Sequence, residues 1–381
     1  MAAAAGDVLV IGAGLAGSLA ALALRQQGLT VTMVAPAQRA IASFCGYGGV
    51  SGWPALPGSF GEAMVRAPAC WQALEQRHGP LGWQSCRLSL HWPEAEAEAA
   101  LPLAERLRAQ VPDSQLLPGR LSLPFGRLDG ELLAQALPRL LEQVGVRRVD
   151  GQVERLEALP AAGWRLWLAA GDQLEAAQVL LAAGPASSRL WPAATGAPSL
   201  GMSWSGALEL EAAACRNDVL PAGAAEGIVI PLLGQRQGLE ARCQQQQQQQ
   251  QQEWIVDAGV APRRGGWWLG QISVVAPAGA AQAAPDATWM EAELRRGLHA
   301  TWPELAALPG RFVRVPVAFP GADGPLFGPI AGAPGLWGLA GFSAAFSLLP
   351  VLAPLLAQAL ALEGAPVPAA AGPGAAGAGG G

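Results

Sequence analysis

The stretch that decides the fold is Asp7-Val8-Leu9-Val10-Ile11-Gly12-Ala13-Gly14-Leu15-Ala16-Gly17-Ser18. In it, a run of apolar residues is followed by three glycines, and apolar residues then recur at helical spacing. This pattern predicts a strand, a phosphate-binding turn and a helix over residues 15–27. Gly12 permits the tight turn, Gly14 lets the backbone approach a pyrophosphate, and Gly17 lets the helix pack against the strand. We expect a dinucleotide to be bound by Gly12, Ala13, Gly14, Leu15, Ala16 and Gly17.

A second strand is predicted at residues 30–34, at the spacing expected for a dinucleotide-binding unit. An acidic residue usually ends this strand and binds the adenosine ribose, but Ala35 stands there instead. Gln38 is the nearest uncharged polar side chain that could hold the ribose. Arg39 is the alternative, because an arginine there accepts a 2′-phosphate and would favour NADP.

The composition excludes several classes of protein. A chain of 381 residues that is 51% hydrophobic can form two domains or one elaborate α/β domain. Its net charge of −5 and the lack of a basic run argue against nucleic-acid binding. The sequence contains no lysine, which excludes Schiff-base and pyridoxal phosphate chemistry.

Cysteine and histidine show no metal-ligand spacing. The five cysteines are scattered and odd in number, as in a reducing compartment, so we expect a cytoplasmic protein. The three histidines are far apart, so no metal site is predicted. The first cation, Arg25, follows the apolar run rather than preceding it, which argues against a signal peptide.

Further elements follow from periodicity and turn residues. Helices are predicted at residues 62–78, 94–108, 130–144, 286–302 and 344–361, the third and fourth capped by Asp129 and Asp286. Strands are predicted at residues 151–156, 164–168, 173–176, 178–184, 312–317 and 336–340, and an antiparallel sheet within residues 200–275. The glutamine run 244–252 is expected to be a mobile loop, and residues 364–381 a disordered tail.

Residues 324–362 contain no charged side chain, which makes a membrane span the alternative to a buried segment. Gly341, Pro350 and Pro354 divide the stretch, and this favours a buried strand, turn and helix. We therefore expect no membrane span.

In their order and spacing, these motifs resemble the flavin-dependent D-amino acid oxidase family, in particular its glycine oxidase and sarcosine oxidase-like branch. The resemblance runs from Asp7 to about Leu362. Besides the first glycine turn, it is carried by Ala42-Ser43 before a glycine cluster, Leu128-Asp129-Gly130, Val153, Leu181-Ala182-Ala183-Gly184, the segment 323–328 and the turn Gly338-Leu339-Ala340-Gly341-Phe342-Ser343.

The resemblance implies a Rossmann-type α/β FAD-binding domain interleaved with an antiparallel-sheet α+β substrate domain. Residues 1–52, 116–199 and 320–363 would bind FAD, and residues 53–115 and 200–319 would form the substrate side. FAD would be noncovalent, because no cysteine follows Cys243 in the region where sarcosine oxidase-like members attach it. The implied further FAD-binding residues are Ala42, Ser43, Val153, Ala183, Gly184, Gly341, Phe342 and Ser343.

The implied reaction is oxidation of a small amine or amino acid, of the glycine, sarcosine or D-amino acid type, to an imine with O2 as acceptor. Arg314 is the candidate residue for the substrate carboxylate, although it lies several residues before the family's usual position; the alternative is a structural arginine at a strand edge. Trp267 or Trp268 could supply an apolar wall, although only one can line the cavity because adjacent strand residues face opposite sides; the alternative is that both are core residues. Two alternatives remain: a flavin monooxygenase, disfavoured by Phe342 and Ser343 in the last turn, and a noncatalytic flavoprotein scaffold.

Overall fold

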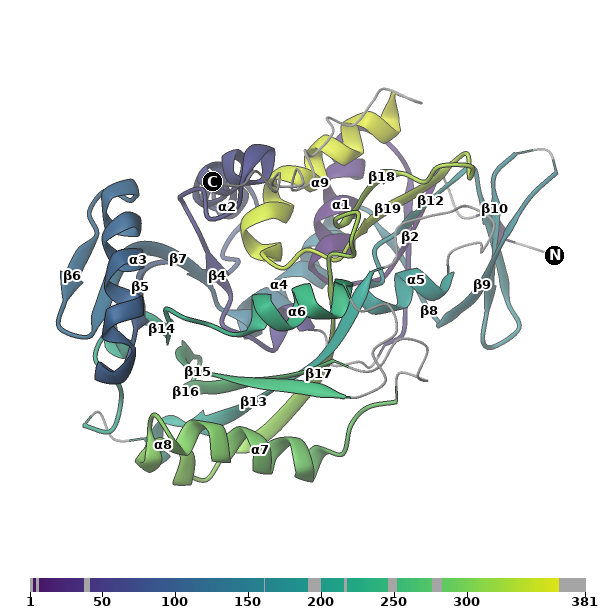
Figure 1. The fold of residues 1–381 in the computed structure, drawn as a ribbon. Coiled ribbons are helices and arrows are strands. Elements are labelled where there is room, and N and C mark those ends of the chain that lie inside the picture. The colour runs from purple at the N-terminus through teal and green to yellow at the C-terminus, as the bar shows by residue number, and fades with distance from the viewer. Residues whose placement is uncertain are drawn as a thin grey trace, which may run out of the picture.

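The computed structural model describes residues 3–4, 7–37, 42–160, 162–190, 200–215, 218–245, 252–275 and 283–362. In the described residues, the strands form three sheets of six, four and nine strands (Figure 1). The predicted residues Gln38 and Arg39 and the tail 364–381 lie outside these ranges.

The six-stranded sheet contains the first predicted motif. Its strands, in spatial order, are β18 (Leu326–Pro329), β19 (Leu336–Ala340), β12 (Gln178–Leu181), β2 (Val8–Ile11), β3 (Val31–Ala35) and β8 (Arg147–Asp150). All neighbouring pairs are parallel except β18 with β19. Every residue of β2, β3 and β19 is buried, as expected for continuous apolar runs covered on both faces.

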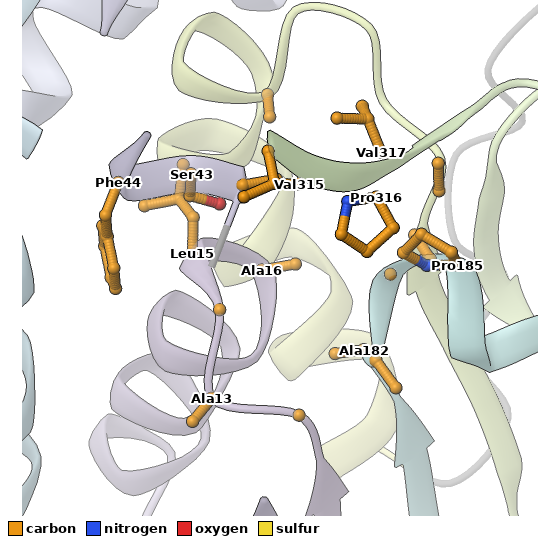
Figure 2. Close-up of a pocket in the computed structure, with 18 of the residues that line it drawn as sticks. Ala13, Leu15, Ala16, Ser43, Phe44, Ala182, Pro185, Val315, Pro316 and Val317 are labelled. Carbon is orange, nitrogen blue, oxygen red and sulfur yellow. The ribbon is translucent and has the colours of Figure 1, made fainter. Parts of the chain in front are cut away.

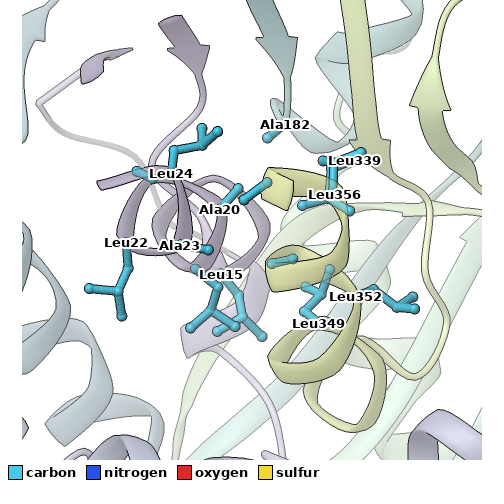
Figure 3. Close-up of a cluster of buried hydrophobic side chains, with 14 of the residues drawn as sticks. Leu15, Ala20, Leu22, Ala23, Leu24, Ala182, Leu339, Leu349, Leu352 and Leu356 are labelled. Atoms are coloured by element: carbon cyan, nitrogen blue, oxygen red, sulfur yellow. The ribbon is translucent and has the colours of Figure 1, made fainter. Parts of the chain in front are cut away.

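Helices α1 (Leu15–Gln26) and α9 (Ala345–Ala361) pack together beside this sheet. Figure 3 shows Ala20 and Leu15 on the side of α1 that faces α9, and they belong to one buried cluster with Leu349 and Leu356 of α9. The uncharged stretch 324–362 therefore forms the predicted buried strand, turn and core helix, and in addition the strand β18, which was not predicted. Among the described residues, no helix has the length and apolarity that crossing a membrane requires.

Helix α2 (Gly58–His78) joins the same core. Its Trp71 is fully buried, and the indole Nε1 donates a hydrogen bond to the carbonyl oxygen of Phe346 in α9, at 2.8 Å. Although α2 falls in the predicted substrate segment 53–115, its apolar face thus packs on a helix of the predicted FAD-binding segments.

A four-stranded sheet lies at one end of the molecule (Figure 1). It contains β1 (Ala3–Ala4), β11 (Gln173–Ala176), β10 (Trp164–Leu168) and β9 (Val153–Ala158). The antiparallel pairing of β10 with β11 confirms the predicted hairpin.

The nine-stranded sheet is mixed rather than wholly antiparallel. Its strands are β17 (Arg311–Phe319), β13 (Gly201–Glu211), β16 (Gly266–Val275), β15 (Glu253–Arg263), β14 (Gly227–Pro231), β5 (Trp83–His91), β7 (Arg120–Leu128) and β4 (Gly49–Val50), with β6 (Gln115–Leu117) beside β7. The strands β5 and β14 pair in parallel. The predicted boundary at residue 116 differs from this topology, because β7 pairs along its whole length with β5.

The remaining helices lie around these sheets. They are α3 (Ala97–Gln110), α4 (Gly130–Gln143), α5 (Ser187–Leu190), α6 (Arg236–Gln245), α7 (Ala287–His299) and α8 (Pro303–Ala307). Asp129 accepts hydrogen bonds from two backbone N–H groups at the start of α4, and Asp286 accepts one at the start of α7, so both predicted caps are confirmed. The glutamine run was wrongly predicted to be all loop: α6 includes residues 244 and 245, and residues 246–251 lie outside the described part.

The two faces of strands β13, β16 and β17 carry different side chains. Helices α6 and α7 lie on opposite sides of these strands (Figure 1). Ile272, Val274 and Leu208 pack with α7, and we call this side the α7 face. Val275, Ile255 and Phe319 pack with Leu239 of α6, and we call that side the α6 face. Because side chains alternate along a strand, the register assigns every other residue to one face.

Candidate functional site

A cavity of about 1050 Å³ lies between the carboxyl ends of the parallel strands and the edge strand β17. Figure 2 shows Ala13 and Ala16 from the first turn, Ala182 and Pro185 from the end of β12, and Pro316 from β17 around it. In an open parallel sheet, the crevice at the carboxyl ends of the strands is the usual ligand site. The cavity is therefore where the glycine turn predicts a dinucleotide.

The glycine turn has the geometry that the sequence predicts. Gly12 has a φ of +111°, and a Cβ there would lie 2.9 Å from the Cα of Ala183. Gly17 does not line the cavity. A Cβ on it would instead collide with the carbonyl oxygen of Gly12. It is thus the glycine that lets α1 approach β2, while Gly12 and Gly14 present backbone to the cavity.

The N-terminus of α1 fits an anion. The helix starts at Leu15, and no acidic residue lies in its first turn. Its first N–H groups have no intrahelical acceptor, and the helix dipole makes this end positive. Leu15 and Ala16 line the cavity at this end. The pyrophosphate of a dinucleotide is the kind of group that such an end holds.

The other predicted FAD-binding residues come from segments far apart in the sequence, and the fold brings them to this one cavity. They are Ala42, Ser43, Val153, Ala183, Gly184, Gly341, Phe342 and Ser343. Residues 42–44 form a short 3-10 helix, Val153 begins β9, and Ala183 follows β12. The backbone N–H of Ala183 donates to the Ser187 hydroxyl at 3.1 Å, which fixes this strand end.

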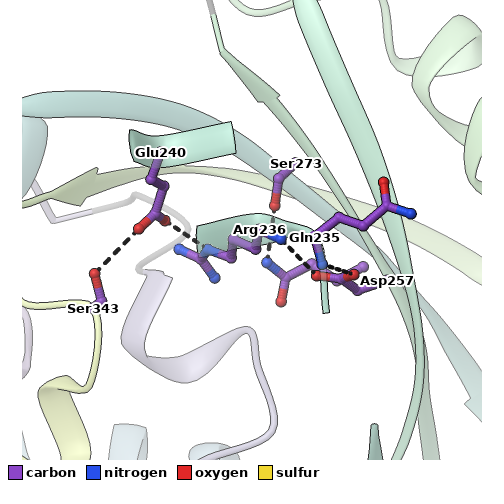
Figure 4. A network of polar contacts seen from close by, with 7 residues as sticks. Gln235, Arg236, Glu240, Asp257, Ser273 and Ser343 are labelled. Atoms are coloured by element: carbon purple, nitrogen blue, oxygen red, sulfur yellow. Dashed lines mark hydrogen bonds and ion pairs between the residues drawn. The ribbon is translucent and has the colours of Figure 1, made fainter. Parts of the chain in front are cut away.

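The turn before α9 forms another part of the wall. Gly341 has a φ of +82°, which its lack of a side chain allows. The ring of Phe342 meets those of Phe60 and Phe327 edge to face, at centroid distances of 6.3 and 6.2 Å. The Ser343 hydroxyl donates to Oε2 of Glu240 in α6 at 3.3 Å, as Figure 4 shows.

Polar side chains of the α6 face also line the cavity. They are Ser205 of β13, Gln271 of β16 and Arg236 of α6. Gln271 donates from Nε2 to the Ser273 hydroxyl at 3.1 Å, and Arg236 donates from Nε to Oε1 of Glu240 at 2.8 Å (Figure 4). Sequence reasoning missed these residues, because none belongs to a motif and only strand pairing brings them together.

Arg314, the predicted carboxylate-binding residue, lies in the cavity wall at the edge strand β17. Its register partner is Gly206, and its guanidinium carbon lies 5.9 Å from the ring centre of Trp204. These pairings place the Arg314 side chain on the α7 face, opposite Ser205 and Gln271. The predicted role of Arg314 stays a prediction.

Of the two interpretations of Trp267 and Trp268, cavity wall or core, the structure agrees with the core. Neither Trp267 nor Trp268 lines the cavity; Trp267 packs in the cluster of the α7 face, and Trp268 packs in a separate cluster with β5 and β7. The two residues do face opposite sides, as alternation requires. Trp204 is the tryptophan in the cavity wall, and strand pairing rather than any motif places it there.

The residues that line the cavity include buried polar groups and arginines. Four lining residues have a buried polar atom with no hydrogen-bond partner in the described part of the chain: Tyr47 Oη, Trp204 Nε1, Ser205 Oγ and Arg314 Nη1. Burial raises the pKa of Tyr47, so its hydroxyl stays protonated and able to donate. The charged residues of the wall are all arginines, namely Arg148, Arg189, Arg236 and Arg314. A wall of this kind fits ligands with oxyanion or carbonyl acceptors.

Cys45 is the cysteine that lines the cavity in the described residues. Burial raises the pKa of its thiol, so the nucleophilic thiolate is disfavoured. Within the same residues, no group of three or more histidine, cysteine or acidic side chains could hold a metal ion.

Solved structures share this fold. Glycine oxidase from Geobacillus kaustophilus matches with a TM-score of 0.71 at 18% identity, covering 95% of each chain. Iminodiacetate oxidase from Chelativorans sp. BNC1 matches with a TM-score of 0.67 at 17% identity, covering 95% of this chain and 97% of that one. FAD-bound L-alpha-glycerophosphate oxidase from Mycoplasma pneumoniae matches with a TM-score of 0.67 at 13% identity, covering 94% and 95%.

A search of curated proteins found no match. The family model described as FAD dependent oxidoreductase (DAO) matches residues 7–359, nearly the whole chain. The glycine cradle, the start of α1 and the cavity of about 1050 Å³ fit the cofactor that this family binds. The chain belongs to the FAD-dependent oxidoreductase family, and its cofactor is FAD.

Proposed function

We propose that this protein oxidises a small amine or amino acid, of the glycine, sarcosine or D-amino acid type, to an imine and passes the electrons to O2. The observation that carries the proposal is the cavity, which joins a dinucleotide cradle to a wall whose charged side chains, among the described residues, are all arginines. When bound, FAD supplies hydride acceptance from the substrate carbon. The glycine oxidase and iminodiacetate oxidase folds support this assignment.

The chain would bind the cofactor through its backbone. Gly12, Gly14 and the start of α1 would hold the pyrophosphate, and Val153 would meet the adenine. The positive N-terminal end of α9, preceded by Gly341 and Ser343, would stabilise the negative charge that develops at the pyrimidine end of the ring system. FAD would be held without a covalent bond, because no cysteine follows Cys243 in the given sequence, where sarcosine oxidase-like members attach the flavin.

The opposite part of the wall would orient the substrate. Polar side chains such as Gln271 would hold acceptor atoms of the substrate, and apolar residues such as Met202 and Val315 would exclude water. A guanidinium in this wall would hold a substrate carboxylate, the role predicted for Arg314. The division of the chain into interleaved FAD and substrate domains is part of this proposal. We assign β7 to the substrate domain, because it pairs with β5.

Oxygen consumption tests the proposal. The purified holoenzyme is mixed with glycine, sarcosine, D-amino acids and N-methyl amines, and hydrogen peroxide is measured in parallel. We expect at least one compound to give stoichiometric oxygen loss and peroxide. Oxygen consumption that requires NADPH would favour a monooxygenase instead, and no turnover with any compound would favour a scaffold.

A further inference from the structure

Helix α6 covers part of the α6 face and is anchored at both its start and its buried side. Asp257 of β15 accepts hydrogen bonds from the backbone N–H groups of Gln235 at 2.8 Å and Arg236 at 3.3 Å (Figure 4). Leu239 is 1% exposed and packs with Phe319. The position of Arg236 at the first turn is therefore fixed by the backbone and not only by its side chain.

The guanidinium of Arg236 is held on one side and open on the other. Its Nε donates to Oε1 of Glu240 at 2.8 Å, and Glu240 is 7% exposed. The other oxygen of that carboxylate accepts the hydrogen bond from Ser343. Neither terminal nitrogen of Arg236 makes a hydrogen bond to any described residue, although the residue lines the cavity. The two terminal N–H groups are thus available for a bidentate contact with a planar oxyanion.

We propose that Arg236 binds the substrate carboxylate and that Glu240 is the positioning residue that orients it. The inference rests on the proposed function and deepens it, since it makes the substrate a carboxylate-bearing amine. Arg236 lies on the α6 face with Gln271 and Ser205, and Glu240 ties it to Ser343 beside the flavin-binding turn. Arg314, in contrast, lies on the α7 face.

Glu240 also neutralises the charge of Arg236 in the empty site. Its negative charge balances that of Arg236, so an uncharged ligand does not leave an unpaired buried cation. A bound carboxylate would contact the two terminal nitrogens of the guanidinium, while Glu240 continues to accept the hydrogen bond from Nε. The same carboxylate contacts Ser343, so binding at Arg236 should perturb the flavin environment and be visible in its absorbance.

The test is a titration of the holoenzyme with acetate, with acetamide as the uncharged probe of similar shape, followed by flavin absorbance. The variants are Arg236→Met, Arg314→Met and, as a control on the same helix, Arg242→Met. Arg242 pairs with Glu253 and does not line the cavity. We expect Arg236→Met to weaken acetate binding by about tenfold to a hundredfold, since bonds to charged groups have effects of this size. Arg242→Met should bind acetate like the parent protein.

Glu240 needs its own readout, because a buried carboxylate also affects folding. Glu240→Ala should raise the acetate dissociation constant and the KM of a carboxylate substrate more than it lowers kcat. Glu240→Gln, whose amide oxygen can still accept from Arg236 and whose amide nitrogen can donate to the Ser343 hydroxyl, should restore most of the acetate binding. Equal FAD content and circular dichroism spectra show that each variant has folded.

Three outcomes overturn the inference. The first is loss of the acetate response in Arg314→Met but not in Arg236→Met. The second is equal weakening of acetamide and acetate by Arg236→Met. The third is a parent holoenzyme whose flavin absorbance does not change with acetate but whose flavin is reduced by amines without a carboxylate. In that case the proposed function stands. If Arg236-dependent acetate binding is found but no amine or amino acid reduces the flavin, the proposed function fails and the carboxylate site stands.

Discussion

Replacing Gly12 with alanine tests the cofactor cradle. A Cβ at this position would lie 2.8 Å from the carbonyl carbon of Ala182 and 2.9 Å from the Cα of Ala183, and closer still to the Ala182 oxygen. All three atoms belong to the backbone of the small-residue segment after β12. The turn or this segment must therefore shift, and both line the cavity.

The size of the effect follows from the backbone. A residue other than glycine at a φ of +111° carries about 1–3 kcal/mol of strain, and relief of the collision displaces the pyrophosphate cradle. Since 1.4 kcal/mol is a factor of ten, we expect the FAD dissociation constant of Gly12→Ala to rise by at least about tenfold. Titration of the apoprotein with FAD, followed by quenching of flavin fluorescence, measures it.

Gly28→Ala is the matched control. Gly28 also has a positive φ, +85°, but a Cβ there would meet nothing within 4 Å, and Gly28 does not line the cavity. This variant should lose about 1 kcal/mol of stability and keep the FAD affinity of the parent protein. FAD affinity in Gly12→Ala equal to that of Gly28→Ala would refute the assignment of the glycine turn as the cofactor cradle.

Three further predictions concern a helix cap, a buried histidine and the flavin linkage. Asp129→Ala removes the acceptor of two N–H groups at the start of α4 and should lower the free energy of unfolding by about 1 kcal/mol in urea, while Asp129→Asn keeps most of it. Burial lowers the pKa of His91 from 6.5, so the unfolded chain binds a proton there more readily than the folded chain. The urea midpoint of unfolding should therefore fall as the pH drops through 6.5. His91→Gln should weaken this pH dependence. Acid precipitation should release FAD into the supernatant, and yellow colour left in the pellet would contradict noncovalent binding.

Local signals in the sequence predicted most of the fold. The strand, glycine turn and helix at residues 8–26 form as expected because each residue type suits its place locally. Periodicity and caps likewise identified α4, α7 and the core helix α9. The parallel pairing of β5 with β14 was missed, because these strands are far apart in the sequence and no local pattern specifies a partner.

The sequence likewise predicted some residues of the candidate site and missed others. The glycine turn, the end of β12 and the turn before α9 were predicted because small residues mark places where backbone approaches a ligand. The sequence did not predict the lining residues whose position depends on the register of the strands and on where α6 packs, namely Arg236, Gln271, Ser205 and Trp204. Tyr47 had a signal, because it is the single tyrosine in the chain and lies in the glycine-rich segment after residues 42–43.

The most direct test of the central claim is anaerobic reduction of the flavin in the purified holoenzyme. Under argon, the oxidised protein is mixed with glycine, sarcosine, D-amino acids and N-methyl amines, and flavin absorbance is followed in a stopped-flow instrument. The account predicts bleaching by at least one carboxylate-bearing amine and recovery of the absorbance when O2 is admitted. A flavin that dithionite reduces but that no amine or amino acid bleaches would contradict it.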